Sequence, residues 1–245
     1  MNKELFSSTC ETILKGEYQK NGIGTLQEKT LHKILKCYFE PYEINREVKI
    51  GGYVADIVGE NGIIEIQTQQ FNAMRKKLEV FLSVGIVTVV YPIAHIKWLS
   101  WIDTETGQKT KSRKSPKIGQ IYSIIDELYK IKFLLTNPNL HFCIALIDME
   151  EYRYLNGWSR DKKKGSSRFD RIPTDIYDEV YIENLNDYLK FIPENLPMSF
   201  SSAEYKKSTG LSLPSARTAL NVLHYIGVLK RVGKKGNSYL YEKNI

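Results

Sequence analysis

The stretch VADIVGENGIIEIQT, residues 54–68, predicts a β-hairpin around which the rest of the chain can be arranged. Residues 54–58 and 63–68 are rich in the β-branched residues that favour strands. Asn61-Gly62 between them is a strong signal for a tight two-residue turn, in which both central residues take a positive φ. The two strands should therefore run antiparallel.

The turn decides which side chains face each other. If residues 61–62 form the loop, Asp56 lies opposite Gln67, and Glu65 sits diagonally one pleat away. If residues 60–61 form it, Asp56 faces Glu65 directly. Because side chains alternate between the two faces of a strand, either loop keeps all three polar side chains on one face. A loop of odd length would separate them.

Two carboxylates on one face of an otherwise apolar hairpin indicate a cation site. Asp56 and Glu65 would repel each other and resist desolvation. A divalent ion removes both difficulties, and Mg²⁺ prefers one or two carboxylates together with water and phosphate oxygens. We therefore predict that Asp56 and Glu65 bind Mg²⁺ or Mn²⁺. The alternative is that Glu65, Gln67 and Gln69 form the solvated face of a half-exposed sheet.

The composition of the 245 residues is that of a globular protein, and the formal charge of +7 favours a polyanionic partner. Cys10, Cys37 and Cys143 are scattered without CxxC spacing, as in reduced cytosolic proteins. The first residues lack the basic-then-apolar order of a signal peptide, and the longest apolar run, 81–96, is too short to span a bilayer. We expect a cytoplasmic protein that does not enter membranes.

The region around the hairpin predicts helix, three strands, helix and strand in that order. Thr25 and Glu28 have the spacing of a capping box at the start of the first helix, which Pro41 ends. Glu28 can close that capping box, point toward the hairpin as a further acidic group, or do both. The other predicted elements are strands at 47–50 and 86–91 and a helix at 72–84.

This order, with Asp56 on the second strand and Glu65-x-Gln67 on the third, resembles the PD-(D/E)XK nuclease superfamily. The resemblance covers about 70 residues and implies an α/β (α+β) fold, in which a mixed sheet flanked by helices carries a restriction-endonuclease-like site. It implies that Asp56 and Glu65 hold Mg²⁺ at a phosphodiester, with Glu28 as a further catalytic acid. It also gives Gln67 the place of a catalytic residue.

Gln67 departs from the superfamily pattern, which usually has lysine at this place. Lysine would orient the attacking water and stabilise charge in the transition state, whereas glutamine only exchanges hydrogen bonds. Some members of the superfamily do carry glutamine here. Arg75, Lys76 or Lys77 on the following helix could supply the missing charge, although each alone fits the solvated face of an amphipathic helix.

Residues 97–192 are predicted to elaborate a first domain, 1–192. They read as a hairpin around 104–107 with a basic outer arm, a helix at 118–135 and a strand at 142–147. The basic stretch from Arg160 to Arg168 could grip a nucleic-acid backbone or be a solvated loop.

The last segment, 193–245, is predicted to be a second domain that follows the linker 193–197. Helices at 199–207 and 214–226 and a hairpin of strands 228–232 and 238–241 resemble a winged helix-turn-helix. The resemblance implies contact with double-stranded DNA through the early positions of the second helix and through the hairpin tip. These residues are Ser215, Arg217, Thr218, Asn221, Lys234 and Lys235. A winged helix that docks another protein is the alternative.

The sequence thus favours a Mg²⁺-dependent DNA endonuclease, and a restriction or defence role would follow from fold analogy alone. The second hypothesis is a DNA-binding regulator whose nuclease-like domain no longer cuts, which Gln67 keeps open. An RNA nuclease is a third, because hydrolysis of the backbone is common to both polymers. A homodimer would suit the cutting of both strands, although no stretch marks an interface.

Overall fold

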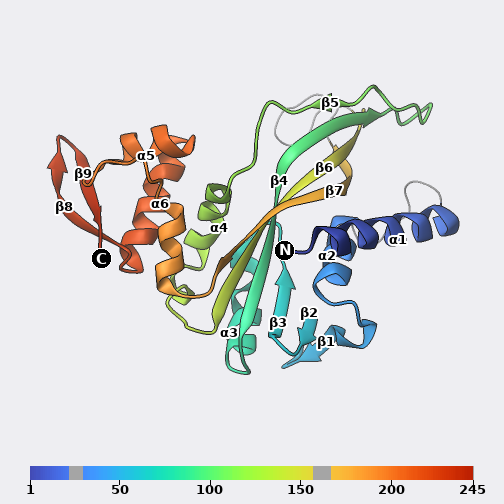
Figure 1. Cartoon of the computed structure of the whole chain (residues 1–245), viewed down its shortest axis with the longest axis horizontal. Coiled ribbons are helices and arrows are strands. Elements are labelled where there is room, and N and C mark those ends of the chain that lie inside the picture. The colour runs from blue at the N-terminus through green and yellow to red at the C-terminus, as the bar shows by residue number, and fades with distance from the viewer. Residues whose placement is uncertain (22–29, 157–166, 245) are drawn as a thin grey trace. The chain divides into compact units, whose positions relative to one another are not determined.

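The computed structural model describes residues 1–21, 30–156 and 167–244, and it shows an α+β protein with a large mixed sheet flanked by helices (Figure 1). In the described part, seven strands form this sheet in the order β1-β2-β3-β4-β6-β7, with β5 paired to β4. Their bounds are β1 Arg46–Ile50, β2 Tyr53–Gly59, β3 Gly62–Ile66, β4 Val87–Ile102, β5 Arg113–Lys114, β6 Leu140–Tyr154 and β7 Ser167–Ile182. The predicted mixed sheet is confirmed, because β2 and β3 pair antiparallel whereas β3 and β4 pair parallel.

The helices of the described residues are α1 Lys3–Asn21, α2 Thr30–Phe39, α3 Arg75–Leu82, α4 Ile125–Lys130, α5 Ser202–Thr209 and α6 Leu213–Tyr225. The chain divides into two compact units. The first unit comprises Met1–Arg46, Pro92–Gln120 and Ala145–Glu179, and the second comprises Glu47–Tyr91, Ile121–Ile144 and Val180–Ile245. Strands β4, β6 and β7 contribute residues to both units. The predicted division at residue 193 stays a prediction.

The hairpin of β2 and β3 has the second of the two registers that the sequence left open. Ile57 pairs with Ile64 and Gly59 with Gly62, so residues 60–61 form the loop. The expected turn with positive φ at both Asn61 and Gly62 is wrong, because only Gly62 of the two has a positive φ, 97°. A Cβ at Gly62 would lie 2.5 Å from the Ile86 carbonyl oxygen, which restricts this close approach to glycine.

Three predicted elements differ in length from the observed ones. The strand predicted to end at residue 91 continues as β4 through 16 residues, and the strand expected at 142–147 is the 15-residue β6. The helix predicted at 118–135 is instead α4 between the 3₁₀ segments Ile121–Ile124 and Lys132–Leu134. The 16-residue strand β7 was not predicted, since its sequence mixes proline and acidic residues with the apolar ones.

The core of the second unit includes buried side chains of the hairpin and of helix α3. Ala55 and Ile57 of β2 are completely buried, as are Leu78 and Phe81 of α3. Phe71 stacks on Phe142 with ring centroids 6.3 Å apart. Burial of such side chains contributes roughly 1.5–3 kcal/mol each, which holds α3 against the sheet close to the end of the hairpin.

The C-terminal segment has the predicted order of helix, helix and hairpin. Ser201 and Glu204 form a capping box at the start of α5, which ends at Gly210 with φ 69°. The Ser212 hydroxyl caps α6 by accepting the Ser215 N–H at 3.2 Å. Strands β8 Leu229–Lys235 and β9 Ser238–Lys243 then pair antiparallel.

Among the described residues, none of the helices combines the length and the apolar character that crossing a membrane requires.

Candidate functional site

The observed register places Asp56 directly across from Glu65, one position beyond the last paired residues, Ile57 and Ile64. The Glu65 side chain is almost fully buried, with 4% of its surface exposed, and Asp56 is half-buried. The two acids therefore meet on one face at the point where the hairpin ladder stops.

Side chains replace the strand ladder at this point. The Asp56 N–H donates to Glu65 Oε1 at 3.1 Å, and the Ile66 N–H donates to Asp56 Oδ2 at 2.8 Å. Each carboxylate thus accepts a main-chain hydrogen bond from the opposite strand, which fixes both side chains between the strand ends. The two acids therefore lie on one face, as a loop of even length predicts, and their binding of a metal ion stays a prediction.

Lys77 completes the group from helix α3. Its Nζ lies 2.5 Å from Glu65 Oε2, and only 22% of its side chain is exposed. Burial and the nearby Asp56 charge raise the pKa of Glu65, while the Lys77 charge and hydrogen bond partly offset that rise. Two carboxylates this close together repel each other and resist desolvation, the situation that favours a bound cation. We call Asp56 and Glu65 the acidic pair, and Lys77 is its lysine.

Of the three cationic residues on the predicted helix, Lys77 is therefore the one that reaches the strand ends. Arg75 instead donates from Nη2 to the Lys130 carbonyl oxygen and lies over the Phe133 ring, 5.5 Å from its centroid. Lys76 is exposed. Lys77 is the third residue of α3 and lies on the side of the helix that faces the sheet, so its side chain reaches Glu65.

Gln67 follows the last residue of β3. Its N–H donates to the Val90 carbonyl oxygen at 2.9 Å, and its Nε2 donates to the Gln69 carbonyl oxygen at 2.5 Å. The side-chain amide is thus bonded within its own loop. A role for Gln67 in positioning water stays a prediction.

Glu28, the third predicted acid, lies outside the described residues. Within residues 1–21, 30–156 and 167–244, no group of three or more histidines, cysteines, aspartates or glutamates is placed to hold a metal ion. The described acids therefore offer a cation two carboxylates. Mg²⁺ commonly takes its remaining ligands from water and substrate phosphate, so the donor set fits this ion.

The predicted contact residues of α6 differ in exposure. Arg217 is exposed, whereas Ser215, Thr218 and Asn221 are half-buried. The Ser215 hydroxyl donates to Asp126 Oδ2 at 3.1 Å, a contact with α4. Just beyond α4, Lys132 Nζ donates to Asn221 Oδ1 at 3.4 Å. Part of the predicted recognition face is thus occupied by neighbours within the second unit.

The hairpin of β8 and β9 is basic and aromatic. Lys234 and Lys235 are exposed, as predicted for its tip. Arg231 lies 4.1 Å from the Tyr239 ring centroid, and Lys234 lies 5.0 Å from the same centroid. These cation–π contacts hold two positive charges on one face of an exposed ribbon.

Two further buried acids were not predicted from the sequence. Glu127 Oε2 accepts the Phe71 N–H at 2.8 Å and thereby closes the turn before α3. Glu151, completely buried on β6, is surrounded by basic side chains from neighbouring strands. Lys97 comes from β4 and Arg153 from β6 itself, whereas Arg168 and Arg171 reach Glu151 only through the pairing of β6 with the unpredicted strand β7.

Comparison with known proteins adds a family and a relative. A family model described as "Domain of unknown function (DUF8091)" matches residues 29–183, more than half of the chain. An "Uncharacterized protein" of Treponema pallidum (strain Nichols) is 29% identical over 229 residues, which cover 90% of this chain and 87% of the relative. No solved structure matches significantly.

Proposed function

We propose that this chain, which belongs to the family of the domain of unknown function DUF8091, is a metal-dependent endonuclease that hydrolyses DNA. The observation that carries the proposal is the convergence of Asp56, Glu65 and Lys77 at the open end of a hairpin. Within this proposal the sheet is restriction-endonuclease-like, and the helices and hairpin after residue 193 form a winged helix.

Each residue of the acidic pair has a defined task in this reaction. Asp56 and Glu65 would hold Mg²⁺ or Mn²⁺, which lowers the pKa of water and offsets charge on the phosphate. Main-chain hydrogen bonds preorganise both carboxylates, so little reorganisation is needed when substrate arrives. Lys77 orients Glu65 and supplies positive charge next to the scissile phosphate, the contribution that Gln67 lacks.

Double-stranded DNA is the substrate that the charge distribution favours. Arg217 on α6 and Lys234 and Lys235 on the hairpin are exposed cations of the segment that resembles a winged helix. Such cations displace counterions from the phosphate backbone and fix the duplex in register. A homodimer would present two sites to the two strands. Cys10, Cys37 and Cys143 are not joined in disulfides, which supports a cytoplasmic location.

Plasmid cleavage with Mg²⁺ or Mn²⁺ tests the proposal. The Glu65→Ala variant should lose at least about 100-fold in cleavage rate, since loss of a mere outer-shell partner of a metal ligand already costs 10–100-fold in activity. The Glu79→Ala variant is the matched control, because Glu79 is an exposed acid on α3. Equal cutting by wild type and Glu65→Ala would mean contamination and would end the proposal.

A second candidate is a DNA-binding regulator with an inactive nuclease-like part. It is favoured by the closed network at the site, because a backbone N–H and the Lys77 ammonium already occupy the two oxygens of Glu65. A regulator should bind duplex DNA equally well with and without Mg²⁺. Calorimetric titration with Mg²⁺ separates the candidates: an enzyme should show heat of binding in the wild type that is lost in Asp56→Asn.

A further inference from the structure

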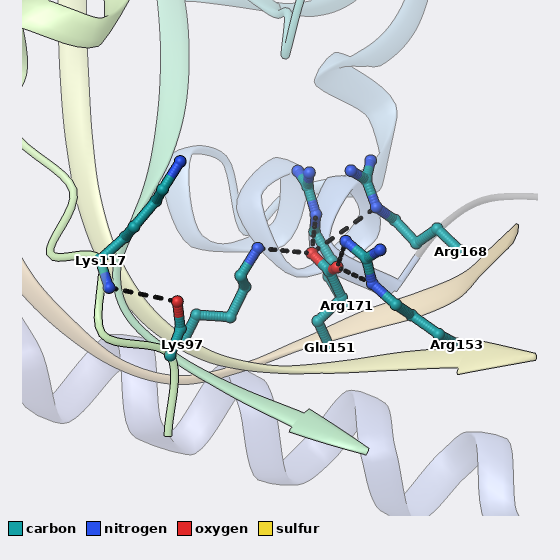
Figure 2. Close-up of polar contacts among 7 residues, drawn as sticks. Lys97, Lys117, Glu151, Arg153, Arg168 and Arg171 are labelled. Carbon is teal, nitrogen blue, oxygen red and sulfur yellow. Dashed lines mark hydrogen bonds and ion pairs between the residues drawn. The ribbon is translucent and has the colours of Figure 1, made fainter. Parts of the chain in front are cut away.

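Glu151 is the centre of a cluster of positive side chains in the first unit. Its side chain has no exposed surface, yet four cations from three strands contact it (Figure 2). Arg153 makes the closest contacts, with Nη2 at 2.5 Å and Nε at 2.6 Å from Oε1. The other three approach Oε2 at 3.2 to 3.6 Å. We call this set the Glu151 cluster: Lys97 on β4, Glu151 and Arg153 on β6, and Arg168 and Arg171 on β7.

The cluster carries more positive charge than its carboxylate can neutralise. Even without Arg171, the three cations Lys97, Arg153 and Arg168 face one anion, and these four side chains together have a net charge of +2. Burial would raise the pKa of Glu151, but the charges of Lys97, Arg153 and Arg168 outweigh it and lower that pKa to about 2. The carboxylate is therefore ionised at every physiological pH and stays in place as a fixed anchor.

The excess charge is costly for the protein alone. Burial lowers the pKa of Lys97, the Glu151 charge and hydrogen bond partly offset that fall, and the like charges of Arg171 and Arg153 add to it. A network that served only stability would need one or two cations for one buried carboxylate. The acids adjacent in sequence to the cluster have other partners. Asp170 accepts hydrogen bonds from the Arg171 N–H at 2.7 Å and from the Thr30 hydroxyl, and Glu150 accepts one from the Tyr152 hydroxyl and lies 3.9 Å from Lys109 Nζ.

The cations can be reached from solvent although their anchor cannot. Their side chains are 18% to 38% exposed, and Arg168 is the most exposed. Arg168 approaches Glu151 through Nε, and Figure 2 shows its Nη end turned away from the carboxylate. A guanidinium fork held by its Nε in this way still presents donors with the geometry that phosphate oxygens require.

We propose that the Glu151 cluster is a binding site for phosphate groups, and that the backbone of a nucleic acid supplies them. The carboxylate orients the cations, and the phosphate takes up the remaining positive charge. This assignment rests on the proposed function only in naming nucleic acid as the source. Free phosphate and pyrophosphate share the same chemistry, so the experiment treats them separately.

The test measures DNA binding in EDTA, so that cleavage plays no part. Fluorescence anisotropy of a labelled duplex, followed over a series of salt concentrations, compares wild type with the Arg168→Gln/Arg171→Gln double variant. The Lys3→Gln/Lys15→Gln variant removes the same charge from exposed positions on α1 and serves as the control. In a parallel arm, calorimetry titrates each protein with inorganic phosphate and with pyrophosphate.

We expect the double variant to bind the duplex at least about tenfold more weakly, while the control stays at the wild-type value. The negative slope of log K against log salt concentration should become shallower by about 2, because each of the two lost phosphate contacts contributes about 0.9 to its magnitude. If the double variant does not fold by circular dichroism, Arg168→Gln alone should reduce the slope by about 1. The proposal would be overturned if the variants bind the duplex with the wild-type affinity and salt slope and the wild-type protein binds neither phosphate nor pyrophosphate.

The remaining outcomes are also decisive. Pyrophosphate binding that disappears in the double variant, with duplex binding unchanged, would support the phosphate site and overturn nucleic acid as its source. Because the assay contains no metal, an inactive acidic pair would leave its result intact. Conversely, wild-type binding by the double variant would leave the plasmid-cleavage test of Glu65 unaffected.

Discussion

Replacing Lys77 by methionine tests whether a charge holds the acidic pair together. Methionine keeps most of the apolar stem but removes the ammonium, which lies 2.5 Å from Glu65 Oε2 and 5.4 Å from the Phe81 ring centroid. A hydrogen bond to a charged group contributes about 1.5–3 kcal/mol, and breaking a fully buried pair costs about 3–5 kcal/mol. Because 22% of the Lys77 side chain is exposed, we expect a loss of about 2 kcal/mol at neutral pH.

The loss should depend on pH in a defined direction. Burial and Asp56 raise the pKa of Glu65 above its ordinary value of 4.5, so the folded state binds this proton more tightly than the unfolded state does. Stability therefore falls as pH rises through the folded pKa, and without Lys77 it should fall further. The difference in stability between wild type and Lys77→Met should be small near pH 4, where Glu65 is protonated in both proteins. It should reach its full size at pH values above the folded-state pKa of Glu65.

Urea unfolding near pH 4 and near pH 7.5 measures both effects. Far-UV circular dichroism is the suitable signal, because Trp98 and Trp101 lie in the first unit and would report on a different region. About 2 kcal/mol corresponds to a midpoint lower by about 1 M urea. Lys76→Met, which removes an exposed charge from the same helix, is the control. An equal loss at both pH values would refute the electrostatic reasoning and assign the effect to packing.

Three further predictions concern other regions. The wild-type protein should lose about 3 kcal/mol of unfolding free energy as pH falls from about 4.5 to about 2, because the pKa of Glu151 is lowered to about 2 in the folded state. Urea unfolding at a series of pH values should show that Glu151→Gln lacks this loss. Lys234→Gln/Lys235→Gln should weaken duplex binding by a similar factor for all sequences and reduce the salt slope by about 2, whereas a sequence-dependent loss would argue for base contacts. Gly62→Ala should destabilise the hairpin by at least about 2 kcal/mol in thermal unfolding, because its Cβ would meet the Ile86 carbonyl oxygen at 2.5 Å; a neutral result would contradict this close approach.

The sequence predicted the centre of the fold because the signals there are local. Alternation of apolar residues and a compact turn fixed two strands, and the even loop length fixed the face on which Asp56 and Glu65 lie. Which even loop forms was not predictable, because Asn61-Gly62 favours one turn while the contact of Gly62 with Ile86 favours the other. That contact joins residues of different elements and leaves no trace in the local pattern.

Long-range pairing accounts for what the sequence did not indicate. Strand β7 carries Pro173 and several acidic residues, so its propensity is weak, and only its place beside β6 makes it a strand. Arg168 and Arg171 join the Glu151 cluster only through that pairing. Lys77 was one of three equivalent cations in the sequence, and the orientation of α3 on the sheet selected it.

The contact of α6 with its neighbours also bears on how the C-terminal segment can move. Ser215 bonds to Asp126 of α4, and Asn221 bonds to Lys132 just after that helix. Helix α6, tethered in this way, cannot move independently of α4. A protease cut between residues 193 and 197 should therefore yield two fragments that stay associated through size-exclusion chromatography.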